Sequence, residues 1–113
     1  MASIFSKVIL SGSTNGRPIA VASTATPGTL MHTAHATAID EVWLYAVNTS
    51  GAPRTITIEF GGVTSGDLFT VSLDPDTGLA LLVPGLPLTN SLVVGAFADA
   101  AGVNITGWVN RIA

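Results

Sequence analysis

The sequence contains no cysteine and few charged residues. Of its 113 residues, 10% are charged and 48% are hydrophobic, whereas an average soluble domain carries about 25% charged residues. The absence of cysteine excludes a disulfide framework, a thiol nucleophile and a thiolate metal site. A small domain has too much surface for its volume to bury all of its apolar residues by itself. We therefore expect part of the outer surface to be buried against other copies or another protein.

Positive charge is also scarce. The four basic residues, Lys7, Arg17, Arg54 and Arg111, are scattered along the chain, and the formal net charge is −3. A nucleic-acid-binding protein needs a cluster of basic residues to neutralise phosphates, so the sequence predicts no nucleic-acid partner. The length predicts one domain.

The sequence predicts neither a membrane-spanning helix nor a secretory signal. Residues 18–39 and 77–98 are uncharged and long enough to cross a bilayer, but the first is rich in Thr, Ser and His, and the second contains Pro84, Pro87 and several polar residues. Such clusters are typical of turns between strands rather than of one helix in lipid. The N-terminus has no basic region followed by a long apolar core. We therefore expect no membrane partner.

The order of apolar and polar residues predicts an all-β protein. Helical periodicity is nearly absent, and short runs rich in Val, Ile and Thr are separated by Gly, Pro, Asn and Asp. Thr55–Phe60 alternates, which places Thr57 and Glu59 on a water-facing side. Val42–Val47 is apolar on both sides. It therefore predicts a central strand with one side on the core and the other against something else.

Eight or nine strands are predicted, with turns at a spacing of roughly 8–12 residues that is typical of a sandwich or barrel. Residues 16–113 form the predicted sandwich domain, and residues 1–15 form either an N-terminal arm or an edge strand. The segment Pro84–Asn90 is predicted to be a turn. The other strands are predicted at Ile4–Leu10, Ile19–Ser23, Thr29–Ala36, Asp67–Leu73, Leu79–Val83, Leu92–Ala98 and Val103–Arg111.

No metal or cofactor site is predicted. His32 and His35 are the only histidines, and their spacing places them on opposite sides of a strand, as ordinary polar positions. They would need further ligands from elsewhere to hold a metal. The segment Asp74–Gly78 faintly resembles a calcium loop, but Pro75 interrupts it and Pro84 stands where the loop needs Glu. A turn is the favoured interpretation.

No enzyme is predicted either. The segment Gly62–Gly66 has Thr64 where a nucleophile elbow needs Ser, and no set of Ser, His and carboxylate stands out. A small β-sandwich enzyme stays an alternative. A polar cleft that holds His32 or His35 with a carboxylate would support it.

Three aromatic residues are candidates for binding. Trp43 and Tyr45 share one side of a predicted strand, and Trp108 lies in the last predicted strand. Aromatic residues dominate sandwich cores and subunit interfaces, so we expect these three to lie in the core or an interface. A sugar-binding platform is the alternative.

Several segments resemble small structural proteins of tailed bacteriophages. They are Asp40–Ser50 followed by Ile56–Gly62, then Val83–Val94 and the terminal Ile105–Arg111. The resemblance covers most of the chain from about Gly16 onward. These segments are similar to capsid decoration (cement) proteins and head-fibre domains, which are often single jelly-roll sandwiches that assemble as trimers. The motifs are structural, so the resemblance implies no catalytic residue.

The resemblance implies a single jelly-roll-like β-sandwich of about eight strands that forms a homo-oligomer, with a trimer expected. Its partner would be the major capsid protein, and its place would be the capsid surface of the virion after assembly in the host cytoplasm. The alternative is a tail- or fibre-associated module that binds host glycans, which an exposed Trp43 or Trp108 on a concave surface would favour. The residues expected at an interface are Ile4, Phe5, Val8, Ile9, Leu10, Val42, Trp43, Leu44, Tyr45 and Trp108.

Overall fold

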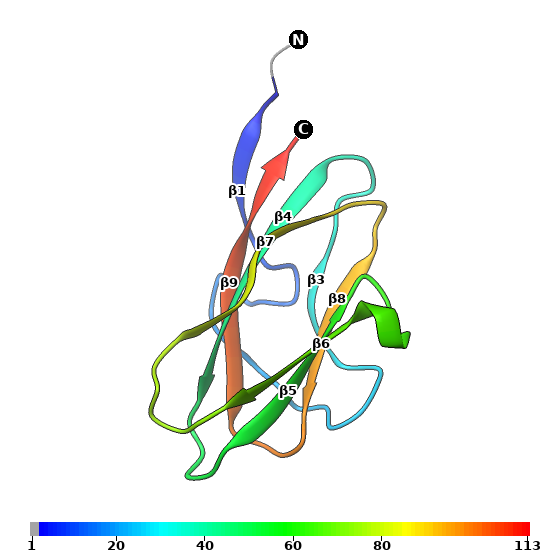
Figure 1. Cartoon of the computed structure of the whole chain (residues 1–113). Helices are drawn as coiled ribbons and strands as arrows, with labels where there is room; N and C mark the ends of the chain where they lie inside the picture. The colour runs from blue at the N-terminus through cyan, green and yellow to red at the C-terminus, as the bar shows by residue number, and fades with distance from the viewer. Residues whose placement is uncertain (1–2) are drawn as a thin grey trace.

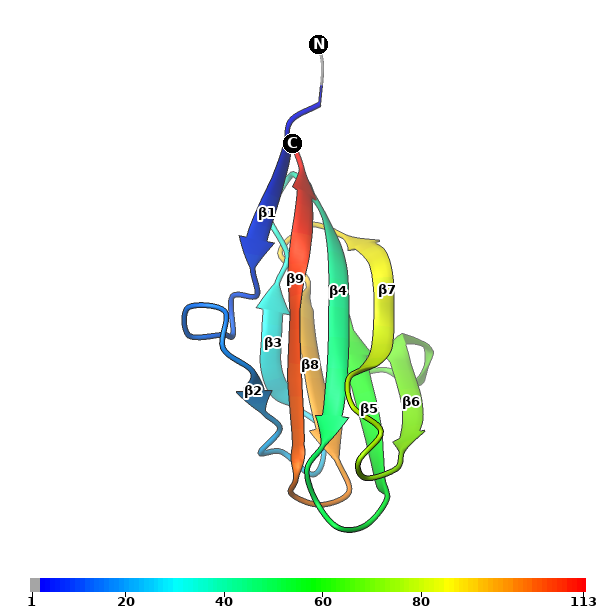
Figure 2. The same cartoon turned by 90° about the vertical axis from the view of Figure 1, so that its left-hand side faces the viewer.

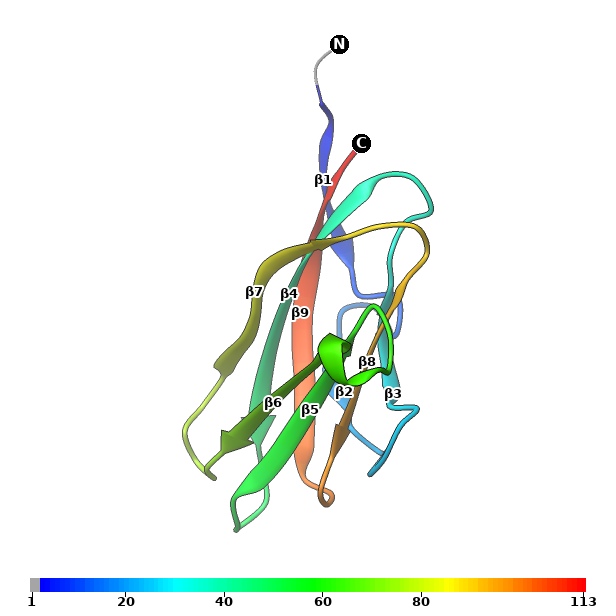
Figure 3. The ribbon, with the colours of Figure 1, turned by 45° about the vertical axis from the view of Figure 1, so that its right-hand side comes forward.

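Two antiparallel β-sheets pack face to face in the computed structural model, which describes residues 3–113 (Figure 1). Sheet A has the order β1 (Phe5–Ile9), β9 (Val103–Ile112), β4 (Ile39–Asn48) and β7 (Ala80–Leu88), with β2 (Ile19–Ala20) also beside β9. Sheet B has the order β3 (Thr29–Thr33), β8 (Val93–Ala98), β5 (Arg54–Phe60) and β6 (Leu68–Leu73). A single 3-10 turn, η1 (Ser65–Asp67), joins β5 to β6 (Figure 3). No helix in the described part of the chain is long and apolar enough to cross a membrane.

The strands pair in a nested order. With β2 left aside, β1 pairs with β9, β3 with β8, β4 with β7, and β5 with β6. Each of these pairs joins one strand from the first half of the chain to one from the second half, folded so that pairs alternate between the two sheets. Eight strands arranged in this way form a jelly roll. The predicted all-β, jelly-roll-like sandwich is therefore confirmed.

The core lies between the two sheets and is built from alternate residues of each strand. In β4 the side chains of Val42, Leu44 and Ala46 are fully buried, and in β5 those of Ile56 and Ile58 are fully buried. This is the period of two that a strand imposes. Further fully buried residues of the same cluster are Met31, Val83, Val94, Ala96, Ile105 and Val109.

The segment Pro84–Asn90, predicted as a turn, is instead mostly strand, because β7 continues to Leu88. Prolines are tolerated here because β7 is the edge strand of sheet A and pairs only with β4. The register between β4 and β7 shifts at two places next to Pro84. Gly85 has a positive φ of 70°, which glycine adopts without strain.

The alternation also predicted that Thr55, Thr57 and Glu59 share a water-facing side; Thr55 is exposed, but the prediction is wrong for Thr57 and Glu59. Both are buried, because β5 is a central strand of sheet B and its outer side is covered. The loop before β3 lies over Glu59, whose carboxylate accepts hydrogen bonds from the Thr26 hydroxyl and from the Gly28 N–H. Alternation gave the correct sides of the strand, but the loop that covers one side comes from another part of the chain.

The segment 1–15 contains an edge strand over Phe5–Ile9. Strand β1 pairs with β9, and the backbone groups of Ile4 and Ala113 extend this ladder by two further hydrogen bonds. Leu10, directly after β1, is buried in the core. The first two residues of the segment lie outside the described part.

Gly107 offers a direct test of how closely β4 and β9 pack. It lies opposite Leu44, and a Cβ at this position would come within 1.9 Å of the Trp43 carbonyl oxygen. Because the obstacle is backbone, we expect Gly107→Ala to cost at least the upper end of the ~1–3 kcal/mol typical of overpacking. Urea unfolding measures this cost. Gly51→Ala is the control, since a Cβ there meets nothing within 4 Å; equal stability of the two variants would contradict the packing described.

Candidate interaction surface

The outer face of sheet A consists of the strand residues that point away from the core. The register places them in rows across β1, β9 and β4: Phe5 with Ile112 and Ile39, Lys7 with Asn110 and Glu41, and Ile9 with Trp108 and Trp43. Tyr45 continues this side of β4, opposite Leu81 of β7. Figure 2 shows the four strands of the sheet side by side, with β1 and β7 at opposite edges.

A row of stacked side chains crosses this face. The Lys7 ammonium nitrogen lies 4.7 Å from the centroid of the Trp108 ring. The rings of Trp108 and Trp43 are stacked, with centroids 5.8 Å apart and planes 4° from parallel. On the far side of Trp43, a Cβ on Gly85 would come within 2.6 Å of its ring. The row Lys7, Trp108, Trp43 and Gly85 therefore links β1, β9, β4 and β7 in the order of the sheet.

The stacked row bears on the glycan alternative. Aromatic residues bind sugars by stacking, which requires an open ring face. Trp108 has Lys7 on one side and Trp43 on the other, and Trp43 has Trp108 on one side and Gly85 on the other. Each tryptophan therefore uses one ring face for the other, and both side chains are half-buried. This arrangement does not favour a sugar platform.

Large apolar side chains are exposed around this row. Phe5 is 65% exposed and Ile9 is 53% exposed, and Ile39 and Leu81 are exposed as well. The only charged residues among these outward positions of β1, β9 and β4 are Lys7 and Glu41. Exposed apolar surface of this kind marks interaction sites in folded proteins.

The structure narrows the predicted set of interface residues. Leu10, Val42 and Leu44 are buried in the core, and Val8 is half-buried against it. Their side chains are therefore used within the chain, because the period of two turns them inward. The predicted residues that lie on the surface are Ile4, Phe5, Ile9, Trp43, Tyr45 and Trp108, to which the structure adds Ile39, Leu81 and Ile112.

A shallow apolar socket opens at the β7 edge of this surface. It has a volume of about 290 Å³. Ile39 contributes from the start of β4, and the end of β7 and the following loop contribute the rest. The lining residues are Ile39, Pro87, Leu88, Thr89 and Leu92. We call this depression the apolar socket.

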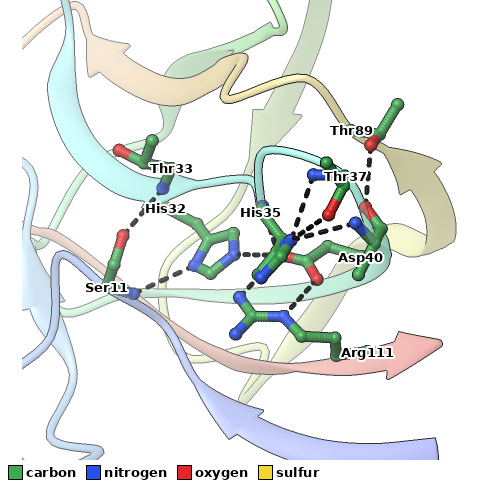
Figure 4. Close-up of polar contacts among 9 residues, drawn as sticks. Ser11, His32, Thr33, His35, Thr37, Asp40, Thr89 and Arg111 are labelled. Atoms are coloured by element: carbon green, nitrogen blue, oxygen red, sulfur yellow. Dashed lines mark hydrogen bonds and ion pairs between the residues drawn. The ribbon is translucent and has the colours of Figure 1, made fainter. Parts of the chain in front are cut away.

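A buried polar network lies at the same end of the molecule, on the core side of β4 (Figure 4). Asp40 is fully buried. Its carboxylate accepts hydrogen bonds from Arg111 Nε at 2.7 Å and Nη2 at 3.0 Å, from His32 Nε2 at 2.8 Å, and from the His35 N–H at 3.1 Å. The Ser11 N–H donates to His32 Nδ1, so that nitrogen carries no proton. Asp40 and Arg111 therefore form the ion pair of the network, with His32 as a neutral donor.

The contacts of Asp40 determine its charge. Burial by itself would raise the pKa of this carboxyl group. The hydrogen bonds from Arg111, His32 and the His35 backbone, together with the charge of Arg111, outweigh burial and lower the pKa of Asp40 to about 2. The same contact raises the pKa of Arg111. Asp40 is therefore ionised at neutral pH and fully hydrogen-bonded.

This network joins segments that are far apart in the chain. His32 and Asp40 are at most 1% exposed, and the Ser11 hydroxyl accepts a hydrogen bond from the Thr33 N–H instead of contacting the histidine ring. His35 lies beyond β3, where its Nδ1 accepts from the Thr37 and Ala38 N–H groups. His35 is exposed and lines an open depression whose described lining residues include no Asp or Glu.

Sequence reasoning missed Asp40 and treated His32 as an ordinary polar strand position. The signal for Asp40 was present: it is two residues before Val42, on the same side of β4 as Val42, Leu44 and Ala46, which are all buried. A polar residue in phase with a buried side must find partners. The partners themselves come from β3 and β9, which the local pattern does not identify.

Comparisons of this chain with protein-family models, curated proteins and solved structures find no match. The function is therefore inferred from the chain's own surface and core. The outer face of sheet A and its adjoining apolar socket combine exposed apolar side chains with an apolar depression.

Asp40 predicts an acid dependence of stability. Since its pKa is about 2 in the folded chain and about 3.9 when unfolded, its contribution is present above about pH 4 and is lost as the pH falls toward 2. Hydrogen bonds to a charged group are worth about 1.5–3 kcal/mol. We expect Asp40→Asn to lower the free energy of unfolding at pH 7 by roughly that amount, and to lose less stability on acidification than the unmodified protein. Urea unfolding at pH 7, 4 and 2.5 measures both effects, with the exposed Asp74→Asn as control; identical acid profiles for the two variants would refute the role of Asp40.

The stacked tryptophans predict an energetic coupling. Stacked aromatic pairs are worth about 0.5–1.5 kcal/mol beyond the area they bury. A double-mutant cycle with Trp43→Leu and Trp108→Leu should therefore give a coupling free energy of about 1 kcal/mol in urea unfolding. Pairing Trp108→Leu with Leu79→Ser, an exposed site outside the row, provides the control and should give strict additivity. Additivity of the two tryptophan changes would show that the ring contact contributes nothing.

Proposed function

We propose that this chain is a structural protein of a bacteriophage virion, of the decoration or cement type, which binds and stabilises the head shell as an oligomer. The observation that carries the proposal is the outer face of sheet A, where exposed Phe5, Ile9, Ile39 and Leu81 surround a half-buried aromatic row. Such a face is costly to leave in water. The proposal assigns it to contacts with other protein.

The chemistry of the chain supports binding rather than reaction. Its two buried carboxylates, those of Asp40 and Glu59, accept hydrogen bonds from other groups of the same chain. The scarcity of charge suits a subunit interface, since burying an unpaired charge is costly. A nested sandwich without internal helices also provides a stiff body for holding neighbouring shell subunits together.

The shape supports a directed attachment. The molecule is elongated, with extents of 51 × 27 × 21 Å, and Ile4 pairs with Ala113, so that the start of β1 and the end of β9 lie together at one end of it (Figure 1). That end carries the exposed Ile4, Phe5 and Ile39, whereas the β4–β5 and β8–β9 turns, rich in small and polar residues, lie at the other end. In the proposed assembly, each trimer sits where several major capsid subunits meet, ties them together and thereby resists pressure from the packaged genome.

The proposal is tested on particles of the phage that encodes the chain. Electron cryo-microscopy is expected to show the chain on the outside of the head shell, where several capsid subunits meet. Particles that lack the chain should release their DNA at a lower temperature, and the purified protein added back should restore the original value. Finding the chain only on the tail, or heads of equal thermal stability with and without it, would contradict the proposal.

A further inference from the structure

Phe5 is a large aromatic side chain with little contact inside the chain. It is 65% exposed and lies in β1, the edge strand of sheet A. Its neighbours across the sheet are Ile112 and Ile39, in a row without any charge. Ile39 in turn lines the apolar socket. Phe5 and the socket are therefore the two ends of one apolar row.

The fold keeps these two ends apart within one molecule. Phe5 lies at the β1 edge and the socket at the β7 edge, with β9 and β4 between them (Figure 2). Phe5 therefore does not reach the socket of its own chain. Because a projecting group and a matching depression lie at the same level on opposite edges, one copy can present its Phe5 to the socket of the next.

We propose that Phe5 of one copy inserts into the apolar socket of a second copy, so that subunits join head to tail along the edges of sheet A. The inference rests on the proposed function, in which the chain acts as an oligomer, and identifies the contact. The lining of the socket by Ile39, Pro87, Leu88 and Leu92 suits an aromatic ring rather than a polar ligand. A second copy of this chain is the occupant because each copy carries both halves of the contact.

The charges beside the two halves support this choice. The neighbouring row holds Lys7 on β1, next to Phe5, and Glu41 on β4, next to Ile39 of the socket. Within one copy the Lys7 ammonium lies over the Trp108 ring and the Glu41 carboxylate accepts a hydrogen bond from Asn110 Nδ2, so the β1 side of the row is positive and the β4 side is negative. A head-to-tail contact places these two sides next to each other, whereas two copies that meet through identical β1 edges bring two lysines together. Opposite charges across an interface favour the first arrangement and like charges disfavour the second.

This geometry has a consequence for assembly. A contact between two different surfaces of the same chain is heterologous, and it closes into a ring when the rotation between subunits allows. The trimer of the proposed function is such a ring. In a closed ring every Phe5 occupies the socket of a neighbouring subunit, so no Phe5 and no socket stays exposed.

Size-exclusion chromatography with light scattering tests the contact on the full chain. The unmodified protein is expected to be an oligomer at micromolar concentration, and Phe5→Ser should raise its dissociation constant about tenfold or more, since burial of an aromatic side chain is lost. The control is Leu79→Ser, which removes another exposed apolar side chain, away from the socket, and should leave the oligomer intact. A monomeric unmodified protein, or equal oligomers for both variants, would overturn the inference.

Cross-linking gives a positive signal, because the chain has no native cysteine. The variant with Phe5→Cys and Leu92→Cys is expected to form covalent oligomers between chains on mild oxidation. Moving the second cysteine to Val63, which is exposed outside the socket, should abolish them. Cross-linked dimers of the single variant Phe5→Cys would show contact between identical edges and would contradict the head-to-tail arrangement.

A charge exchange completes the test. Lys7→Glu and Glu41→Lys should each weaken the oligomer, and the two changes together should restore it. An oligomer that binds head shells but is unaffected by Phe5→Ser, and gives no cross-link, overturns this inference and leaves the proposed function standing. Absence of the chain from head shells overturns the proposed function, whatever the cross-links show.

Discussion

The pairing of β4 with β9 is the contact on which the other features of this molecule depend. The two strands run side by side in unbroken register from Ile39 opposite Ile112 to Asn48 opposite Val103. The same ladder places Asp40 opposite Arg111 on the core side and Trp43 opposite Trp108 on the outer side. A slip by one residue would turn every side chain to the opposite side, which would expose the ion pair and bury the tryptophans. The lack of a side chain at Gly107 allows the two backbones to come this close.

The buried polar groups anchor segments that are not part of the sheets. Asp40 binds the backbone at His35 directly and, through His32, the backbone at Ser11, while Glu59 holds the loop at Gly28 against sheet B. No described buried side-chain polar atom lacks a hydrogen-bond partner, so the cost of burying these two carboxylates is offset within the chain. Their role is to determine where the connections lie.

Many of the apolar side chains of this sequence lie in two regions of the fold. One side of each central strand fills the core, and the outer face of sheet A carries a further group of exposed apolar side chains. On that face the stacked row of Lys7, Trp108, Trp43 and Gly85 ties four strands together, and the exposed residues around it stay available. The proposed contact between Phe5 and the socket uses the part of that face nearest the chain ends.

The sequence by itself determined the all-β class, the approximate positions of the strands and the two-sided apolar character of Val42–Val47, because these follow from alternation and turn residues within a few positions of one another. It did not determine that Asp40 and Glu59 are buried, that β7 continues through Pro84 and Pro87, or that the two tryptophan rings stack on each other. It also did not separate Val42 and Leu44, which fill the core, from Trp43 and Tyr45, which face outward. A strand's pattern defines two sides, but distant segments decide which side is covered, which edge lacks a neighbour and where Phe5 lies relative to the socket. Each of these features depends on contacts between residues that are far apart in the chain, and only the tertiary structure decided those contacts.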